Sequence, residues 1–309
     1  MQRRLLALGI DAPGEDPGTY GPATEDAVRA FQRRRGLRED GICGRQTWSA
    51  LVEAGWSLGD RMVYRSARML RGDDVAELQR RLSGLGFDTG KVDGIFGDHT
   101  EHGLVEFQRN AGLTVDGICG PATVRALYQL GERGQPVAAV RERETLRSRP
   151  PTLDGRRIAV GEQGGLGALV RMVQRELMSR GGDAVVLHHP DGAELAASAN
   201  ALDVEVFVAL VLDADGEGCA TAYYEGLGGA SPGGRRLAEL IQSELPETLD
   251  VKDGGSRGMS LPVLRETKMP AVLCELGPAR VVVERGDQVA VALRDALAAW
   301  ACDPLDLSS

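Results

Sequence analysis

The chain has 309 residues, 26% of them charged, and a formal net charge of -9 at pH 7. Its length suits about two to three domains, and its acidic balance excludes a general attraction to nucleic acid or to an anionic membrane surface. No stretch approaches the ~20 apolar residues of a transmembrane helix, and residues 5–10 are too short for the core of a secretory signal. We therefore expect a cytoplasmic protein without a transmembrane segment, exported only if a signal lies upstream of Met1.

The strongest pattern in the sequence is a tandem repeat. Asp-Gly-Ile-Cys-Gly occurs at residues 40–44 and returns at residues 116–120, and Phe-Gln-Arg occurs at residues 31–33 and returns at residues 107–109. The interval between the copies is the same for both words. A fixed interval over this length indicates one structural unit that is duplicated in tandem.

Each copy is predicted to hold three short helices joined by two Asp-Gly turns. In the complete copy, residues 70–131, an acidic first turn starts the first helix, and apolar residues then recur at helical spacing. The other copy, residues 1–55, is incomplete because Met1 aligns with Leu78, in the middle of that helix. Glycine permits the positive φ that tight turns require. The turn residues of the two copies are Asp40, Gly41, Gly44, Asp93, Gly94, Gly97, Asp116, Gly117 and Gly120.

The motifs of the complete copy, in the order in which they occur, resemble those of the peptidoglycan-binding domain type 1 family. These motifs are Leu-Gln, Val-Asp-Gly-Ile-Phe-Gly, Phe-Gln and Val-Asp-Gly-Ile. The resemblance covers both copies. It implies small wall-binding modules whose partner is peptidoglycan or its soluble precursors and fragments. We interpret the individual glycines as residues that fold the turns rather than residues that contact a ligand.

Beyond the repeats the sequence changes character. Residues 132–154 combine glycine, proline and mixed charge with little periodic hydrophobicity, which predicts a linker. Residues 155–302 alternate strands with helices and predict an α/β domain with a mainly parallel sheet covered by helices. The predicted strands are 157–161, 184–187, 204–212, 219–224 and 271–275, and the predicted helices are 168–180, 194–201, 234–245 and 287–300. The fold class is therefore multidomain, with two small three-helix all-α repeats ahead of an α/β domain.

Two sequence motifs in this domain carry a second resemblance. Residues 261–277 read Leu-Pro-Val-Leu-Arg-Glu-Thr-Lys-Met-Pro-Ala-Val-Leu-Cys-Glu-Leu-Gly, and residues 198–201 read Ser-Ala-Asn-Ala before a buried strand. The domain resembles the zinc-dependent N-acetylmuramoyl-L-alanine amidases of type 3, which carry similar words. A pair of peptidoglycan-binding repeats ahead of such a domain makes each assignment support the other.

The amidase resemblance implies a zinc ion held by two histidines and one glutamate, with a second glutamate as general base. Gln163 stands at the first histidine position and Val211 at the second, and most of the loop that bears the glutamate ligand is absent. Only the general base survives, as Glu275. Because valine has no lone pair and an amide is a poor zinc ligand, we expect no bound zinc and a vestigial role for Glu275.

Other histidines and acids do not replace the missing ligands. His188 and His189 are adjacent at the end of a predicted strand, so their side chains point in opposite directions. His99 and His102 have helical spacing in the second repeat, where a solvated helix face explains them. Glu162 alone would not hold zinc.

Three functions are compatible with these observations. The arrangement resembles the actinobacterial amidase-like regulators of peptidoglycan synthesis, which implies a catalytically inactive regulator that binds muropeptides or a cell-wall synthesis enzyme. The second hypothesis is an active amidase that hydrolyses the bond between muramic acid and L-alanine. The third is an exported wall-binding protein. Zinc content separates the first two hypotheses, and cell fractionation separates the first from the third.

Overall fold

The computed structural model describes residues 1–130, 137–214, 216–226 and 229–305. These residues form two compact units. The first unit contains the repeats and the second contains the α/β domain, and each has its own hydrophobic core. Across the described ranges, no helix is both long enough and apolar enough to cross a membrane.

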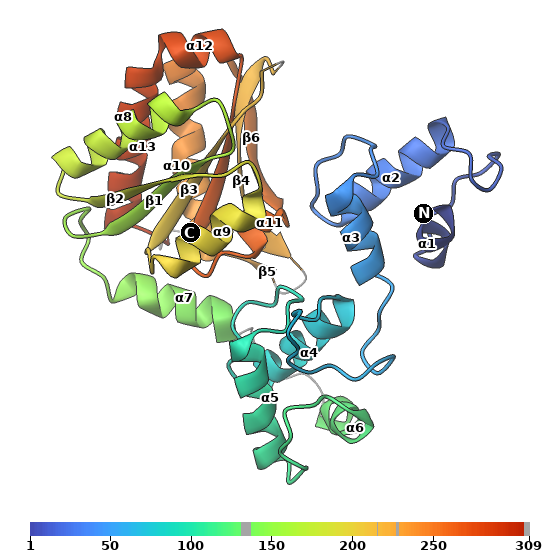
Figure 1. Ribbon diagram of the computed structural model, residues 1–309. Helices are drawn as coiled ribbons and strands as arrows, with labels where there is room; N and C mark the ends of the chain where they lie inside the picture. Colours follow the sequence, from blue (N-terminus) through green and yellow to red (C-terminus); the bar gives the residue numbers. More distant parts are fainter. Residues whose placement is uncertain (131–136, 215, 227–228, 306–309) are drawn as a thin grey trace. The chain divides into compact units, whose positions relative to one another are not determined.

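The first unit consists of the two predicted three-helix repeats (Figure 1). Apolar residues at helical spacing give each helix one face to bury. Phe31 and Leu51 are buried in the core of the first repeat, and Phe96 and Phe107 in the core of the second. The prediction of three short helices per copy is confirmed. The helices are α1 (Gln2–Ala7), α2 (Pro22–Arg34), α3 (Arg45–Glu53), α4 (Asp73–Gly84), α5 (Asp98–Asn110) and α6 (Pro121–Leu130).

The second repeat includes residues ahead of its predicted start at residue 70. Val63 and Cys119 form an antiparallel bridge with N–H to O=C distances of 3.4 and 2.8 Å. Leu58 and Val63 are buried in the core of this repeat, and Arg61 lies 2.6 Å from the buried carboxylate of Asp74. Residues 58–63 therefore pack against the second repeat from outside its predicted range. The sequence pattern missed this segment because it is extended and lacks regular periodicity.

The second unit is built on one mixed sheet. Its strands have the order β2-β1-β3-β7-β4-β5, and β6 also pairs with β4. The pairings β2-β1, β1-β3, β3-β7 and β4-β6 are parallel, whereas β4-β7 is antiparallel. The predicted mainly parallel sheet is confirmed, with β4 and β6 running opposite to β7. The strands are β1 (Arg157–Glu162), β2 (Asp183–His188), β3 (Val206–Leu212), β4 (Gly218–Gly226), β5 (Gly229–Ala230), β6 (Lys252–Met259) and β7 (Ala271–Leu276).

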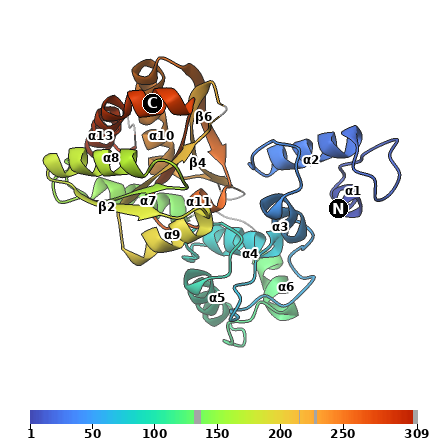
Figure 2. The ribbon, with the colours of Figure 1, turned by 45° about the horizontal axis from the view of Figure 1, so that its top comes forward.

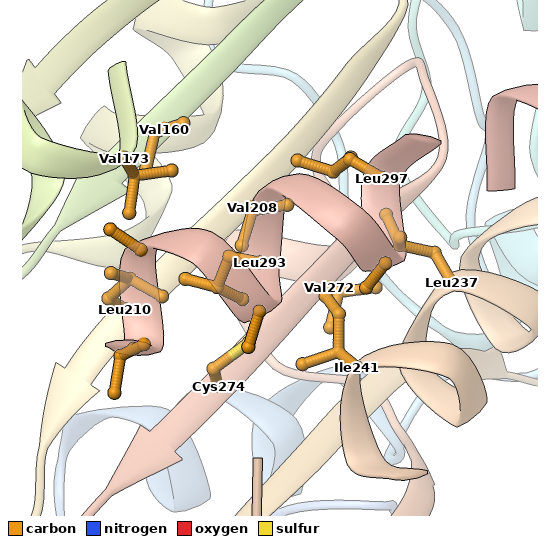
Figure 3. Packing of buried hydrophobic residues seen from close by; sticks show 14 of the residues in the cluster. Val160, Val173, Val208, Leu210, Leu237, Ile241, Val272, Cys274, Leu293 and Leu297 are labelled. Carbon is orange, nitrogen blue, oxygen red and sulfur yellow. The ribbon is translucent and has the colours of Figure 1, made fainter. Parts of the chain in front are cut away.

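Helices cover both faces of this sheet, as Figure 2 shows. On one face lie α8 (Gly167–Ser179), α10 (Pro232–Leu249) and α13 (Gly286–Cys302), and on the other lie α9 (Gly192–Ala201) and α11 (Pro262–Arg265). The short helix α12 (Ala279–Glu284) precedes α13. In the larger core, side chains of the three long helices pack on alternate residues of β1, β3 and β7 (Figure 3). The labelled residues are Val160, Val173, Val208, Leu210, Leu237, Ile241, Val272, Cys274, Leu293 and Leu297.

The predicted linker, residues 132–154, contains helix α7 (Val137–Arg147). Leu146 is buried in the larger core of the second unit. Glu142 Oε1 accepts hydrogen bonds from Gly233 N at 2.9 Å and from Ser231 Oγ at 2.7 Å, which satisfies the first turn of α10. The α/β domain therefore begins near residue 142 rather than at 155. The packing of α7 against the α/β domain was not predicted, because the sequence of α7 is highly charged. Residues 132–136 of the predicted linker lie outside the described residues.

Candidate functional site

Each Asp-Gly turn of the repeats is held by a buried glutamine. Gln79 Nε2 donates to Asp93 Oδ1 at 2.9 Å, to Ile95 O at 3.0 Å and to Thr100 Oγ1 at 3.0 Å. Gln79 Oε1 accepts a hydrogen bond from Gly94 N at 2.8 Å. A buried amide is stable only when its donors and acceptor are paired. The glutamine thus ties α4 to the turn and to the start of α5.

In the part of the first unit that the structure describes, this arrangement is complete at Gln32, Gln79 and Gln108 and occurs in part at Gln2. Gln32 and Gln108 each donate to an Asp, an Ile carbonyl and a Thr, and each accepts a glycine N–H. Gln2 donates to Thr24 Oγ1 and Thr19 O at 3.0 Å and accepts from Gly18 N at 2.8 Å. Each repeat is therefore a pair of half-repeats, a half-repeat being one helix, its glutamine and the following turn. Sequence reasoning found the larger repeat and missed the smaller one, although Leu-Gln and Phe-Gln mark it.

The geometry assigns a folding role to the turn residues predicted from the sequence. Gly41, Gly94 and Gly117 have φ of 73°, 73° and 68°, a conformation that side chains other than glycine rarely adopt. The carboxylates of Asp40, Asp93 and Asp116 are bonded to their glutamine and to the backbone within the turn. Gly44, Gly97 and Gly120 directly precede α3, α5 and α6. These contacts and backbone angles give the residues a role in shaping the turns.

In the second unit, the three positions predicted from the amidase resemblance lie at the carboxyl ends of the parallel strands. Val211 on β3 is in register with Glu275 on β7. Gln163 follows β1, and its N–H donates to Leu210 O at 3.3 Å. Because alternate residues of a strand share a face, all three side chains project toward the side of the sheet that α9 and α11 cover. A Cβ at Gly192, the first residue of α9, would lie 3.2 Å from Gln163 Nε2.

Glu275 is accompanied by an arginine that sequence reasoning missed. Arg257 Nη2 on β6 lies 3.6 Å from Glu275 Oε2, and the glutamate side chain is only 18% exposed. Arg257 is in register with Ala222 of β4, and Ala220 of β4 with Glu275. The small alanine side chains let the arginine reach across β4. The signal in the sequence was a single Arg in the Gly-rich segment 252–259.

These residues do not fit the zinc site of the amidase family. Such a site needs three nitrogen, oxygen or sulfur ligands from the protein and an open position for water. Here Val211 supplies no donor atom and Gln163 supplies a weakly basic amide. Glu275 faces a guanidinium group. Within the described ranges, no three His, Cys, Asp or Glu side chains gather in a way that could hold a metal ion.

Glu162 and the four histidines have other roles. Glu162 accepts hydrogen bonds from Gly164 N at 2.7 Å and Leu166 N at 3.1 Å, and its Oε1 lies 2.8 Å from His188 Nδ1. Burial acts to raise the pKa of Glu162, but His188 and the two N–H groups outweigh it and lower that pKa below its usual value. The carboxylate thus anchors the turn that leads into α8. His189 Nδ1 accepts from Asp191 N, His102 lies beside Glu106, and His99 is exposed on α5.

Asn200, in the Ser-Ala-Asn-Ala word, is a second residue whose role the sequence did not indicate. Its Nδ2 donates to Glu266 O at 2.8 Å, and its Oδ1 accepts from Lys268 N at 2.9 Å. Both groups of the amide are therefore bonded to the loop between α11 and β7. Asn200 fixes the entry into the strand that carries Glu275.

Comparison with protein families assigns both parts of the chain. The peptidoglycan binding domain family matches residues 1–51 and 71–127, and the N-acetylmuramoyl-L-alanine amidase family matches residues 166–284. The amidase match begins after Gln163 and includes the positions of Val211 and Glu275.

Individual relatives agree with these assignments. The N-acetylmuramoyl-L-alanine amidase CwlM of Mycobacterium tuberculosis is 37% identical over 339 residues, covering 96% of this chain and 84% of the relative. The spore cortex-lytic enzyme of Bacillus cereus is 54% identical over 73 residues, which are 24% of this chain and 27% of that enzyme. Among solved structures, an N-acetylmuramoyl-L-alanine amidase from Clostridium difficile 630 is 20% identical, covers 50% of this chain and 100% of its own, and has a TM-score of 0.40.

Proposed function

Because this chain belongs to the peptidoglycan-binding N-acetylmuramoyl-L-alanine amidase family that includes CwlM, we propose that it is a regulator of peptidoglycan synthesis that does not hydrolyse its ligand. The repeats bind peptidoglycan or its soluble precursors. The amidase-like domain serves as a binding platform for a muropeptide or for a cell-wall synthesis enzyme, and the protein acts in the cytoplasm.

The observation that carries this proposal is the pairing of Val211 with Glu275. A hydrolytic amidase of this family needs a metal-activated water beside its general base. The residue in register with Glu275 is an aliphatic side chain without a ligand atom, and Arg257 Nη2 lies 3.6 Å from the glutamate carboxylate. Without ligands for a metal beside it, this carboxylate has no metal-activated water to deprotonate.

The competing function is an active amidase. Two observations favour it, namely the presence of Glu275 and the name of the M. tuberculosis relative. The experiment that separates the two uses the full chain purified from zinc-supplemented medium. Metal content is measured by mass spectrometry, and peptide release from purified peptidoglycan is followed by chromatography beside a zinc amidase that has both histidines.

We expect far less than one zinc per chain and no peptide release above buffer. One tightly bound zinc per chain, with peptide release that disappears in Glu275→Ala, would show an active amidase and overturn the proposal. Fractionation of the native protein tests its location, since recovery from the wall fraction would support the exported wall-binding protein instead.

A further inference from the structure

The two repeats carry an equivalent pairing of arginine with an exposed aromatic ring. Arg4 and Arg81 occupy the same place in Gln-Arg-Arg-Leu, which occurs at residues 2–5 and 79–82. The guanidinium carbon of Arg4 lies 5.7 Å from the ring centroid of Trp48, and that of Arg81 lies 4.0 Å from the ring centroid of Tyr128. Each pair thus joins the first helix of a repeat to its third helix.

The two rings occupy corresponding faces of the third helices. Gly44 precedes α3 and Gly120 precedes α6, so the position of Trp48 corresponds to that of Val124. Tyr128 is four residues beyond Val124, which is one helical turn and the same face. Trp48 is 44% exposed and Tyr128 is 51% exposed. Neither ring is needed to fill a core, so its exposed area is available to a ligand.

The arginine beside Tyr128 is held in place before any ligand arrives. Glu77 Oε1 lies 2.6 Å from Arg81 Nε, and the Arg81 side chain is only 13% exposed. The ring therefore lies against a fixed cation while the residue remains half exposed. Such a pair offers an apolar aromatic surface next to a fixed positive charge.

We propose that these two pairs are the contact sites for the glycan backbone of peptidoglycan, one in each repeat. This inference rests on the peptidoglycan binding proposed above. A pyranose ring presents an apolar C–H face that suits the exposed face of an aromatic ring. The peptide stem lacks a flat apolar face of this kind, and its carboxylates are repelled at long range by the chain's net charge of -9.

The test compares binding of two soluble probes to the full chain. One probe is an oligomer of N-acetylglucosamine and the other is a synthetic stem peptide, and calorimetry measures both affinities. The variants are Trp48→Ala, Tyr128→Ala and the double variant. Tyr64→Ala is the matched control, since Tyr64 is also 44% exposed but has no role in this proposal. Trp48→Phe keeps an aromatic face and should retain most of the affinity.

We expect the double variant to bind the glycan oligomer about tenfold or more weakly, the loss typical of a truncated aromatic anchor, with an unchanged melting temperature. Tyr64→Ala should bind as the unmodified chain does. The inference is overturned if the double variant keeps its glycan affinity, or if the chain binds the stem peptide and not the glycan oligomer. A chain that binds insoluble peptidoglycan unchanged after both substitutions refutes this inference alone, whereas a chain that binds no peptidoglycan refutes the proposed function.

Discussion

The backbone conformation at Gly117 restricts which residue can occupy this position. Its φ is 68° and its N–H donates to Gln108 Oε1 at 2.9 Å. We expect Gly117→Val to destabilise the second repeat by about 1–3 kcal/mol, because a β-branched residue is strained at positive φ. Thermal denaturation followed by circular dichroism measures the effect. Gly120→Ala is the control, since nothing lies within 4 Å of a Cβ placed there. Equal melting temperatures for Gly117→Val and the unmodified chain would contradict the turn assignment.

Asp116 makes the stability of the same turn depend on pH. Hydrogen bonds from Ile118 N and from the Gln108 amide lower the pKa of this carboxylate. A lowered folded-state pKa contributes stability above the unfolded-state pKa, and this contribution is lost as the pH falls through the folded-state pKa. We expect Asp116→Asn, which keeps the Oδ1 acceptor, to lose less stability than the unmodified chain between pH 7 and pH 3. Urea unfolding at both pH values measures the difference, and identical losses would exclude this contribution.

Single residues could be predicted where a sequence motif of the family marks their positions. Gln163, Val211 and Glu275 were located by alignment with such words, and the structure places all three on one face of one sheet edge. Arg257 was not predictable, because its proximity to Glu275 depends on two alanines of β4 that lie between them. Long-range register of this kind leaves no trace in local sequence.

At the scale of the strand, restoring the histidines alone should not restore catalysis. We expect the double variant Gln163→His and Val211→His to release no peptide from peptidoglycan. Val211 packs against the core formed with α9 and α11, so a histidine there needs a polar partner or costs about 1–3 kcal/mol. Peptide release and melting temperature are the measurements, with Val211→Leu as the apolar control. Turnover by the double variant would show that the missing ligand loop is dispensable.

Elements with strong periodicity were predicted well, and those without it were missed. The amphipathic helices α8, α10 and α13 and the apolar strand β3 lie close to their predicted ranges. Strand β6 reads Lys-Asp-Gly-Gly-Ser-Arg-Gly-Met, and its three glycines and exposed polar residues lack the alternation of a typical strand. It forms through pairing with β4, which is tertiary information.

For the molecule as a whole, the boundary between the two units has a measurable consequence. A fragment that begins at residue 142 should be more stable than one that begins at residue 155. The shorter fragment loses the buried Leu146 and Leu153 and the Glu142 contact to the start of α10, and each lost core leucine typically removes about 2–5 kcal/mol. Urea denaturation of the two fragments compares them directly. Indistinguishable midpoints would indicate that α7 is a linker and not part of the α/β domain.

The half-repeats have a kinetic consequence for how the chain acquires its structure. The glutamine bonds of all four networks join residues no more than 22 positions apart. Contacts between near neighbours in sequence favour fast folding, because little loop entropy is lost before they form. The β3-β7 pairing, by contrast, joins Phe207 to Ala271 across a long intervening segment. During synthesis, each repeat can therefore fold as soon as its own helices have been translated. The sheet can form only after its later strands have been translated.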